Sequence, residues 1–133
     1  MAKLVVLDGS ALIRLWDPRH PRHNATVAAI SDLRDAHTKL LIPTTALIDI
    51  LVGAEHEGPH RVRYTLKQIR DAFGTPQPID FKTTTLAARY RANHNIPTPA
   101  ALILATGHLT HATEIITADK TLDGTDPRVR AID

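Results

Sequence analysis

Short apolar runs alternate with longer amphipathic stretches along this chain. The amphipathic stretches repeat their apolar residues every three to four positions and predict helices at residues 11–16, 24–36, 44–52, 62–73, 83–93 and 98–109. The short runs predict strands at residues 4–7, 40–42, 79–81 and 114–117, with a last edge strand at 128–133. This alternation predicts an α/β fold in which a mainly parallel sheet is sandwiched by helices.

Residues that begin or end helices fix the expected boundaries. Asn24 is placed to cap the second helix, and Thr98 with Pro99 marks the start of the last one. Gly53 is expected to end the third helix, which we interpret as largely buried, and Gly74 is expected to end the fourth.

The length and composition predict one domain over residues 1–133. A chain of 133 residues buries about two thirds of the surface that it exposes when unfolded. The chain has no cysteine, which excludes disulfides, thiolate metal sites and a thiol nucleophile. The first apolar run is interrupted at Asp8, far short of a signal peptide or a membrane span, so we expect a cytoplasmic protein without a membrane partner.

Charge alone does not identify a ligand. Sixteen Lys and Arg against 14 Asp and Glu leave a net charge of +2. Arg61, Arg63 and Lys67 lie in a stretch, residues 60–70, that contains no acid, and they are a candidate RNA-binding surface. A solvated helix face explains the same pattern equally well.

Three aspartates stand out as candidate site residues. Asp8 directly follows the strand at 4–7, and Asp119 follows the strand at 114–117 after one intervening residue. Parallel strands bring such residues to the same edge of a sheet. Asp49 lies inside an apolar helix, where a carboxylate is costly unless it faces water or a cation.

Converging carboxylates suit a hard cation, Mg²⁺ or Mn²⁺, because both prefer oxygen ligands. Such a cation lowers the pKa of a bound water and neutralises charge on a phosphodiester, which is the chemistry of nucleic-acid hydrolysis. Ser10 and Thr117 lie beside the two strand-end acids and are candidates to orient them. The alternative is that Asp8 and Ser10 only cap a helix and that Asp119 only stabilises a turn.

Four segments, in order, resemble the PIN-domain family and especially its VapC toxins. They read VVLDGSALIRL, TTALIDILVGA, IPTPAALILATGHL and EIITADKTL. In the family the first carries an acid and a Ser two residues later, the second an acid four residues before a Gly, the third an Asp directly after a Pro, and the fourth a Thr-x-Asp turn. These features match Asp8, Asp49, position 100 and Asp119.

The resemblance implies a Mg²⁺- or Mn²⁺-dependent endoribonuclease toxin that cuts structured RNA, such as transfer RNA or a ribosomal RNA loop. Asp8, Asp49 and Asp119 would hold the metal, and no covalent protein nucleophile is implied. The resemblance also implies a VapB-like antitoxin that covers the cleft with a cationic side chain, and a homodimer.

Two positions depart from the family pattern. Asp49 stands where the family usually has Glu, and Ala100 stands where it has Asp. A methyl group cannot bind a cation, so we expect weakened or absent cleavage. Three explanations stay open: a deliberate Asp→Ala change that makes a toxic nuclease tolerable, which we favour; a natural member with a degenerate site; or a replacement ligand, Asp123.

Two other functions compete with the ribonuclease. A catalytically dead PIN-like module that binds RNA or an antitoxin is favoured by Ala100. A receiver domain or phosphatase would also place an aspartate at the strand ends, but receivers need an acidic pair after the first strand, and none follows residues 4–7.

Overall fold

A parallel β-sheet forms the centre of the computed structural model, which describes residues 3–33 and 37–133. Within these residues the strand order is β2-β1-β3-β4, and every neighbouring pair is parallel. The strands are β1 (Lys3–Leu7), β2 (Thr38–Leu41), β3 (Glu114–Thr117) and β4 (Val129–Ala131). The strands expected at 4–7 and 114–117 are therefore confirmed. The strand expected at 40–42 forms at Thr38–Leu41, and the edge strand expected at 128–133 is limited to Val129–Ala131.

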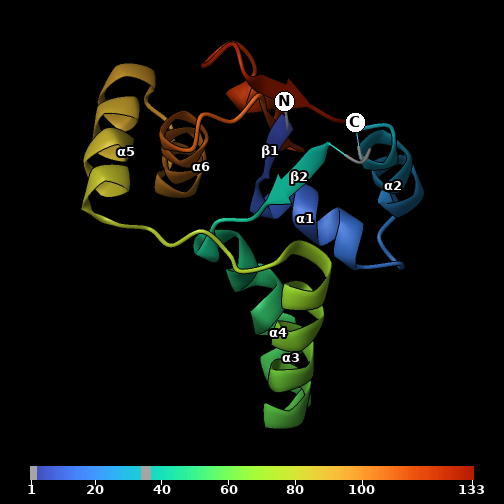
Figure 1. Cartoon of the computed structure of the whole chain (residues 1–133). Helices are drawn as coiled ribbons and strands as arrows, with labels where there is room; N and C mark the ends of the chain where they lie inside the picture. The colour runs from blue at the N-terminus through green and yellow to red at the C-terminus, as the bar shows by residue number, and fades with distance from the viewer. Residues whose placement is uncertain (1–2, 34–36) are drawn as a thin grey trace.

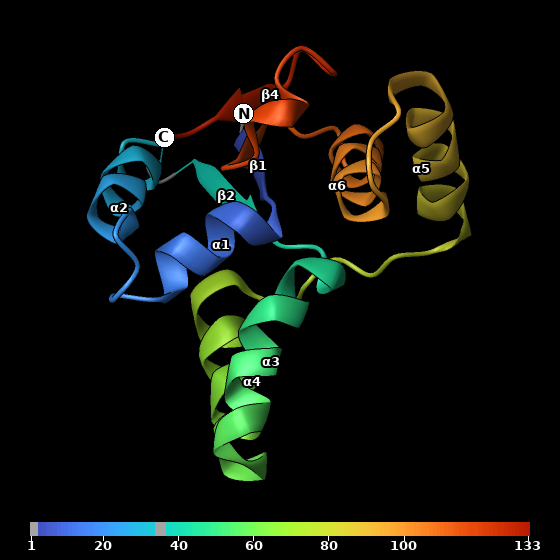
Figure 2. The same ribbon diagram turned by 180° about the vertical axis from the view of Figure 1, so that it is seen from behind.

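Helices cover both faces of the sheet (Figure 1). One face carries α1 (Gly9–Trp16) and α2 (His23–Ser31), and the other carries α5 (Phe81–His94) and α6 (Thr98–Leu109). A hairpin of α3 (Ile48–Glu57) and α4 (Pro59–Phe73) projects beyond the strand ends, as Figure 2 also shows. Two short 3-10 helices, η1 (Thr44–Leu47) and η2 (Lys120–Leu122), complete the elements. The predicted α/β sandwich is confirmed.

Alternating strand side chains build two separate core layers. Val5 and Leu7 pack with α1 and α2, whereas Val6 packs with α6 on the opposite face. A third apolar cluster, which includes Leu12 and Ile69, joins the inner side of α1 to the α3/α4 hairpin. The strand ends are thus held between α1, α6 and the hairpin.

Gly107 lets α6 approach the sheet closely. A Cβ at this position would lie 2.3 Å from Cδ1 and 2.6 Å from Cγ1 of Ile115, which is fully buried in β3. Only a residue without a side chain fits between the helix and the strand in this arrangement. This contact fixes the distance between α6 and the strand ends.

The prediction of a strand at 79–81 is wrong. Gln77 makes one isolated bridge with Pro43, and the chain then enters α5 at Phe81. The Asp80 carboxylate accepts hydrogen bonds from the Thr83 backbone N–H at 3.0 Å and from its hydroxyl at 2.8 Å. Local capping therefore prevails over the short apolar pattern.

Several predicted helix boundaries also need correction. The helix expected at 24–36 begins at His23, with Asn24 inside its first turn, and ends at Ser31; residues 34–36 lie outside the described part. The helix expected at 44–52 starts as η1 and continues past Gly53 to Glu57, where Gly58 at φ 113° ends it. Thr98 is the first residue of α6 rather than its cap.

Other boundary predictions are confirmed. Gly74, at φ 77°, ends α4 as expected, and α6 runs over the predicted residues 98–109. Along the described residues, the helices are too short or too polar to cross a membrane.

Candidate active site

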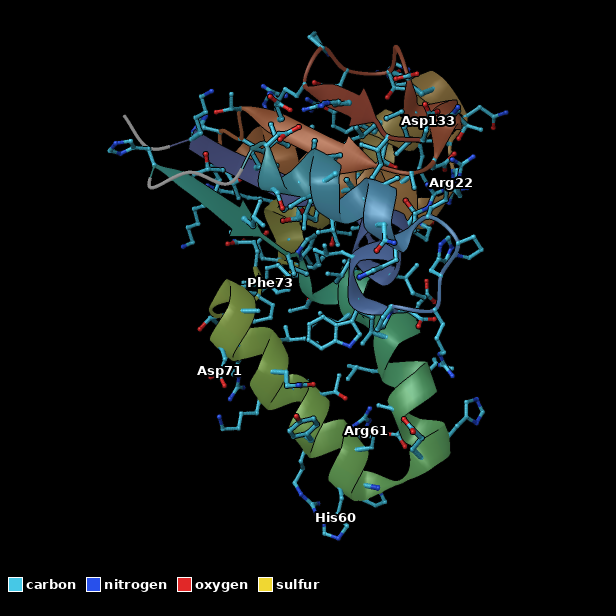
Figure 3. The ribbon with its side chains drawn as sticks, turned by 90° about the vertical axis from the view of Figure 1, so that its right-hand side faces the viewer. Arg22, His60, Arg61, Asp71, Phe73 and Asp133 are labelled. Atoms are coloured by element: carbon cyan, nitrogen blue, oxygen red, sulfur yellow. The ribbon has the colours of Figure 1, made fainter. Side chains whose placement is uncertain are left out.

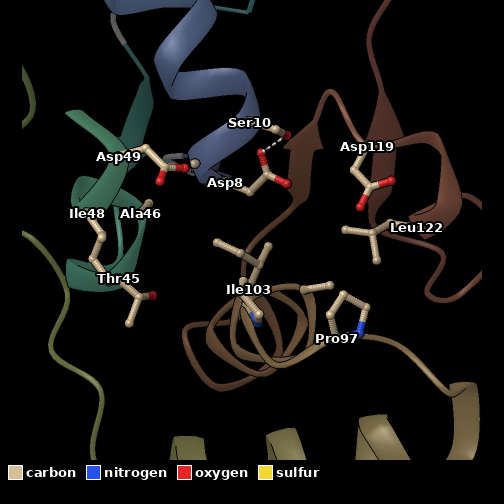
Figure 4. Close-up of a pocket in the computed structure, with 13 residues that line it drawn as sticks. Asp8, Ser10, Thr45, Ala46, Ile48, Asp49, Pro97, Ile103, Asp119 and Leu122 are labelled. Atoms are coloured by element: carbon tan, nitrogen blue, oxygen red, sulfur yellow. Dashed lines mark hydrogen bonds between the residues drawn. The ribbon is translucent and has the colours of Figure 1, made fainter. Parts of the chain in front are cut away.

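A cavity of about 330 Å³ lies at the carboxyl ends of β1 and β3 (Figure 4). Its wall includes Asp8 from the end of β1, Asp49 from α3, Asp119 from the end of β3 and Ala100 from α6. The chain leaves β1 toward β2 on one side and returns through β3 on the other, so the cavity lies at a topological switch point. Four segments far apart in the sequence thus meet around one space.

Asp8 is buried and held in a fixed orientation. The residue is only 6% exposed. Oδ1 accepts hydrogen bonds from the Ser10 hydroxyl at 2.5 Å and from the Ala11 backbone N–H at 2.9 Å, and Oδ2 accepts one from the Thr117 hydroxyl. A carboxylate has about four acceptor positions, so these three bonds leave one free on Oδ2.

Ser10 and Thr117 connect α1 to the end of β3. The Ser10 hydroxyl accepts a hydrogen bond from the Ala118 backbone N–H at 2.9 Å, and the Thr117 hydroxyl accepts one from the Asp119 backbone N–H, also at 2.9 Å. Both hydroxyls also donate to Asp8. The network therefore couples the positions of the two strand-end acids. The capping interpretation of Asp8 is also correct, because its carboxylate caps α1.

Asp119 and Asp49 lie on opposite sides of Asp8 (Figure 4). Oδ1 of Asp119 accepts hydrogen bonds from the Thr121 backbone N–H at 3.0 Å and from its hydroxyl at 2.7 Å. Among the described residues, Asp119 Oδ2 and both oxygens of Asp49 have no hydrogen-bond partner. Asp49 is exposed and lines the cavity, and only Ile50 and Ala54 of α3 are buried, so the interpretation of this helix as largely buried is wrong.

The α6 side of the cavity is apolar. Ala100 is 7% exposed and lies in the first turn of α6, and Ile103 lies one turn further on the same wall. Pro97 and Leu122 complete this side (Figure 4). Ala100 therefore leaves a methyl group where a polar side chain would face the three acids.

The acids of the cavity are the right type of ligand for a divalent cation, but too few of them lie close together. The acids at the cavity offer oxygen atoms only, and each keeps at least one acceptor position free, which is what Mg²⁺ and Mn²⁺ require. Within residues 3–33 and 37–133, however, no three His, Asp or Glu side chains lie close enough together to hold a metal ion. A carboxylate at position 100 would supply oxygen ligands from the α6 wall of the same cavity.

The remaining candidate residues lie elsewhere. Asp123 is exposed at the end of η2 and is not part of the cavity wall. On α4, Arg61 forms an ion pair with Glu57 at 3.2 Å, and Lys67 pairs with Asp71 at 2.8 Å. Arg63 contacts His60 at 2.9 Å. The α4 surface is thus less positive than its sequence suggests.

The sequence interpretation did not single out several residues of the cavity wall. They are Gly9, Thr45, Ala46, Ile48, Pro97, Ile103 and Leu122. Ile103 follows Ala100 by three residues, so helical periodicity alone contained a signal for its position. The η1 residues carried no signal, because only the fold brings this turn beside Gly9, whose added Cβ would lie 3.4 Å from the Ala46 carbonyl oxygen.

Thr117→Val should lower the free energy of unfolding by about 1–3 kcal/mol, because Asp8 Oδ2 loses its hydrogen-bond donor and the Asp119 backbone N–H loses its acceptor. Urea denaturation measures this loss. Thr117→Ser is the matched control, since it keeps the hydroxyl, and it should retain most of the stability. A loss in Thr117→Val no larger than that in Thr117→Ser would contradict the importance assigned to the two hydrogen bonds.

Comparison with protein families gives one match, to the PIN domain, over residues 5–126. No curated protein sequence matches the chain.

Solved structures with similar folds include proteins of toxin–antitoxin systems. A toxin–antitoxin complex from Klebsiella pneumoniae contains a chain with a TM-score of 0.76 and 23% identity, with 96% of each chain covered. FitAcB from Neisseria gonorrhoeae has a TM-score of 0.70 and 16% sequence identity, and the match covers 94% of this chain and 95% of that one. VapC20 from Mycobacterium tuberculosis, a Sarcin-Ricin loop cleaving toxin, has a TM-score of 0.67 and 12% sequence identity. The match covers 87% of this chain and 90% of that one.

Proposed function

Because the chain belongs to the PIN domain family, we propose that it is a VapC-like endoribonuclease toxin whose catalytic site lacks one acidic metal ligand. The observation that carries this proposal is the cavity at the switch point, whose wall contains Asp8, Asp49 and Asp119 together with Ala100. The substrate is a structured RNA, such as a transfer RNA or a ribosomal RNA loop. One structural neighbour is itself described as a toxin that cleaves the Sarcin-Ricin loop.

The protein contributes orientation and negative charge to the reaction. Asp8 is held by the Ser10 and Thr117 hydroxyls, so its free acceptor position faces a fixed direction. Asp49 and Asp119 supply free oxygens from either side. A Mg²⁺ or Mn²⁺ ion bound by these acids would supply positive charge for the phosphodiester and lower the pKa of a coordinated water. The buried apolar wall at Ile103 and Leu122 limits access of bulk water to one side.

The partners follow from the same proposal. Several similar structures are described as complexes with antitoxins or as members of the VapBC family, so a VapB-like antitoxin is the expected protein partner. A homodimer is expected from the family resemblance.

Ala100 also supports a second candidate function. Without a fourth acid, the chain would act as a catalytically dead module that binds RNA or the antitoxin. The two functions can be distinguished by substitution of the remaining acids, because it lowers RNA cleavage only if the chain is a ribonuclease.

Asn substitution at each of the three cavity acids tests the ribonuclease. Asp8→Asn, Asp49→Asn and Asp119→Asn should each lower the residual Mn²⁺-dependent cleavage of total RNA by at least about tenfold, because each removes a charged ligand. Gel electrophoresis of the products, with and without EDTA, measures the rate. A thermal melt of each variant separates loss of activity from loss of folding.

Two further variants complete this test. Asp32→Asn, on the end of α2, is the matched control and should leave cleavage unchanged. Asp123→Asn examines whether that residue replaces the missing ligand, in which case its loss would match the loss from Asp119→Asn. Cleavage that continues in EDTA and is unchanged in all three Asn variants would contradict the proposal.

A further inference from the structure

Three basic side chains gather beside the cavity without a matching number of acids. Lys120 directly follows Asp119, Arg14 lies in the last turn of α1, and Arg22 precedes α2. They come together around Asp133, which follows β4. We call Arg14, Arg22 and Lys120 the basic rim.

Asp133 is the acidic partner that the three cations share. Lys120 Nζ lies 2.6 Å from Asp133 Oδ1. The Lys120 ammonium lowers the pKa of the Asp133 carboxyl first through this hydrogen bond and its charge, and the guanidinium groups of Arg22 and Arg14 lower it further. Figure 3 shows Arg22 and Asp133 next to each other on this side of the molecule.

The backbone around the basic rim is fixed by hydrogen bonds. The His23 ring, through Nδ1, contacts the Arg14 carbonyl oxygen at 2.9 Å, and the Arg22 backbone N–H donates to His20 Nδ1 at 3.0 Å. Nη1 of Arg14 is buried and has no hydrogen-bond partner among the described residues. Arg14 therefore acts on Asp133 through its charge while one of its N–H groups stays unpaired.

The basic rim continues directly from the cavity. Ser10 lines the cavity, and Arg14 lies four residues later, so both fall on the same side of α1 one helical turn apart, about 5.4 Å along the axis. On the neighbouring segment, Asp119 lines the cavity and Lys120 is the next residue. The sugar-phosphate backbone of an RNA leaving the cavity would thus contact positive charge on two segments, α1 and the residues after β3.

Several other cations differ from the basic rim in having an acid of their own. Arg19, Arg61, Lys67 and Arg128 each form an ion pair with an acid within four residues in the sequence. In the basic rim, three cations face one exposed carboxylate, which leaves a local excess of positive charge. Such an excess attracts a polyanion, and its attraction weakens with salt.

We propose that the basic rim binds the phosphates of single-stranded RNA next to the cavity, and that Asp133 covers these cations until the RNA displaces it. This inference rests on the proposed function, since RNA is the substrate that the cavity would cut. Displacement costs little, because Asp133 and Lys120 form an exposed pair, 80% and 69% exposed respectively.

RNA binding without cleavage tests the basic rim. Fluorescence anisotropy of a labelled single-stranded RNA oligonucleotide is measured with EDTA over a series of salt concentrations. In Arg14→Gln/Arg22→Gln/Lys120→Gln, the slope of log K against log salt should fall by about 2, since each lost phosphate contact contributes about 0.7. The dissociation constant should rise by about tenfold at low salt. Asp133→Asn should instead bind RNA about two- to fivefold more tightly.

Matched variants separate position from total charge. Lys39→Gln/Lys82→Gln/Arg89→Gln removes the same charge elsewhere and should keep the slope. Arg22→Gln/Lys120→Gln, which spares the half-buried Arg14, should lower the slope by about 1.4 if the triple variant folds poorly. Thermal melts verify folding in each case.

The outcomes distinguish this inference from the proposed function. An unchanged slope in the basic-rim variants, or an equal loss in the matched triple variant, overturns the basic rim alone. A loss only in Arg61→Gln/Arg63→Gln/Lys67→Gln assigns RNA to α4 instead and also overturns it. Failure of the unaltered chain to bind RNA overturns the proposed function and this inference together.

Discussion

Ala100→Asp should raise Mn²⁺- or Mg²⁺-dependent cleavage of RNA by about 100-fold or more. Position 100 lies in the wall of the cavity opposite three acids, and an added carboxylate would complete an oxygen ligand set there. A factor of 100 corresponds to about 2.7 kcal/mol of transition-state stabilisation, which is within the range expected of a correctly held catalytic metal. The rate of cleavage of total RNA, compared side by side in the two proteins, measures the effect.

The fold should tolerate this substitution. Ala100 is the third residue of α6, and a negative charge in the first turn of a helix interacts favourably with the helix dipole, by about 0.3–1 kcal/mol. The cavity of about 330 Å³ leaves room for the longer side chain. The cost is repulsion between four acids, which a bound cation removes.

Metal binding provides a second measurement of the same prediction. Mn²⁺ should raise the melting temperature of Ala100→Asp more than that of the unaltered chain, because a ligand that binds only the folded state stabilises it. Ala100→Asn is the matched control, since it adds a polar side chain of similar size without the charge. Cleavage by neither protein, with normal folding of both, would favour the binding module.

Gly107→Val should lower the free energy of unfolding by about 3 kcal/mol. The new Cβ would lie 2.3 Å from Cδ1 of Ile115, and neither β3 nor α6 has free space into which to move. Overpacking of this kind costs about 1–3 kcal/mol and occasionally more, and the two methyl groups of Val place it at the upper end. The midpoint and slope of urea denaturation measure the loss.

Gly53→Val is the matched control for this prediction. Gly53 is also in a helix, yet its Cβ would have no atom within 4 Å, so Val should change the stability by less than about 1 kcal/mol. Ile115→Ala combined with Gly107→Val should cost less than the sum of the two single changes, because the clash is removed. Strict additivity would contradict the close contact.

The effect of Gly107→Val should extend to the active site. This glycine sets the distance between α6 and β3, and the same helix carries position 100 to the cavity. In the Ala100→Asp background, a shift of α6 would move the added carboxylate away from Asp8 and Asp119. Cleavage should therefore fall more than the fraction of unfolded protein explains.

Elements with local signals could be predicted from the sequence. The runs at residues 4–7 and 114–117 form strands because they are apolar and lie between turn residues, and Asp8 and Asp119 follow them at the same edge of a parallel sheet. Ala100 was recognisable because the residues around it keep the family pattern. The sequence therefore predicted that Asp8 and Asp119 lie at one edge of the sheet, and their catalytic role is part of the proposed function.

Other features depend on contacts between distant segments and could not be predicted from the sequence. The tertiary structure placed η1 beside Gly9, exposed Asp49 at the cavity, and continued α3 beyond Gly53 because that helix packs along α4. It also gathered Arg14, Arg22 and Lys120 around Asp133, from four separate segments.

The difference has a physical reason. Capping and hydrophobic periodicity act over a few residues, and their signals are therefore present in any short window of sequence. Packing and charge clustering depend on chain segments more than 100 residues apart, as in the hydrogen bonds from Thr117 to Asp8 and from the Ala118 backbone N–H to Ser10. These contacts exist only once the sheet and its helices have assembled.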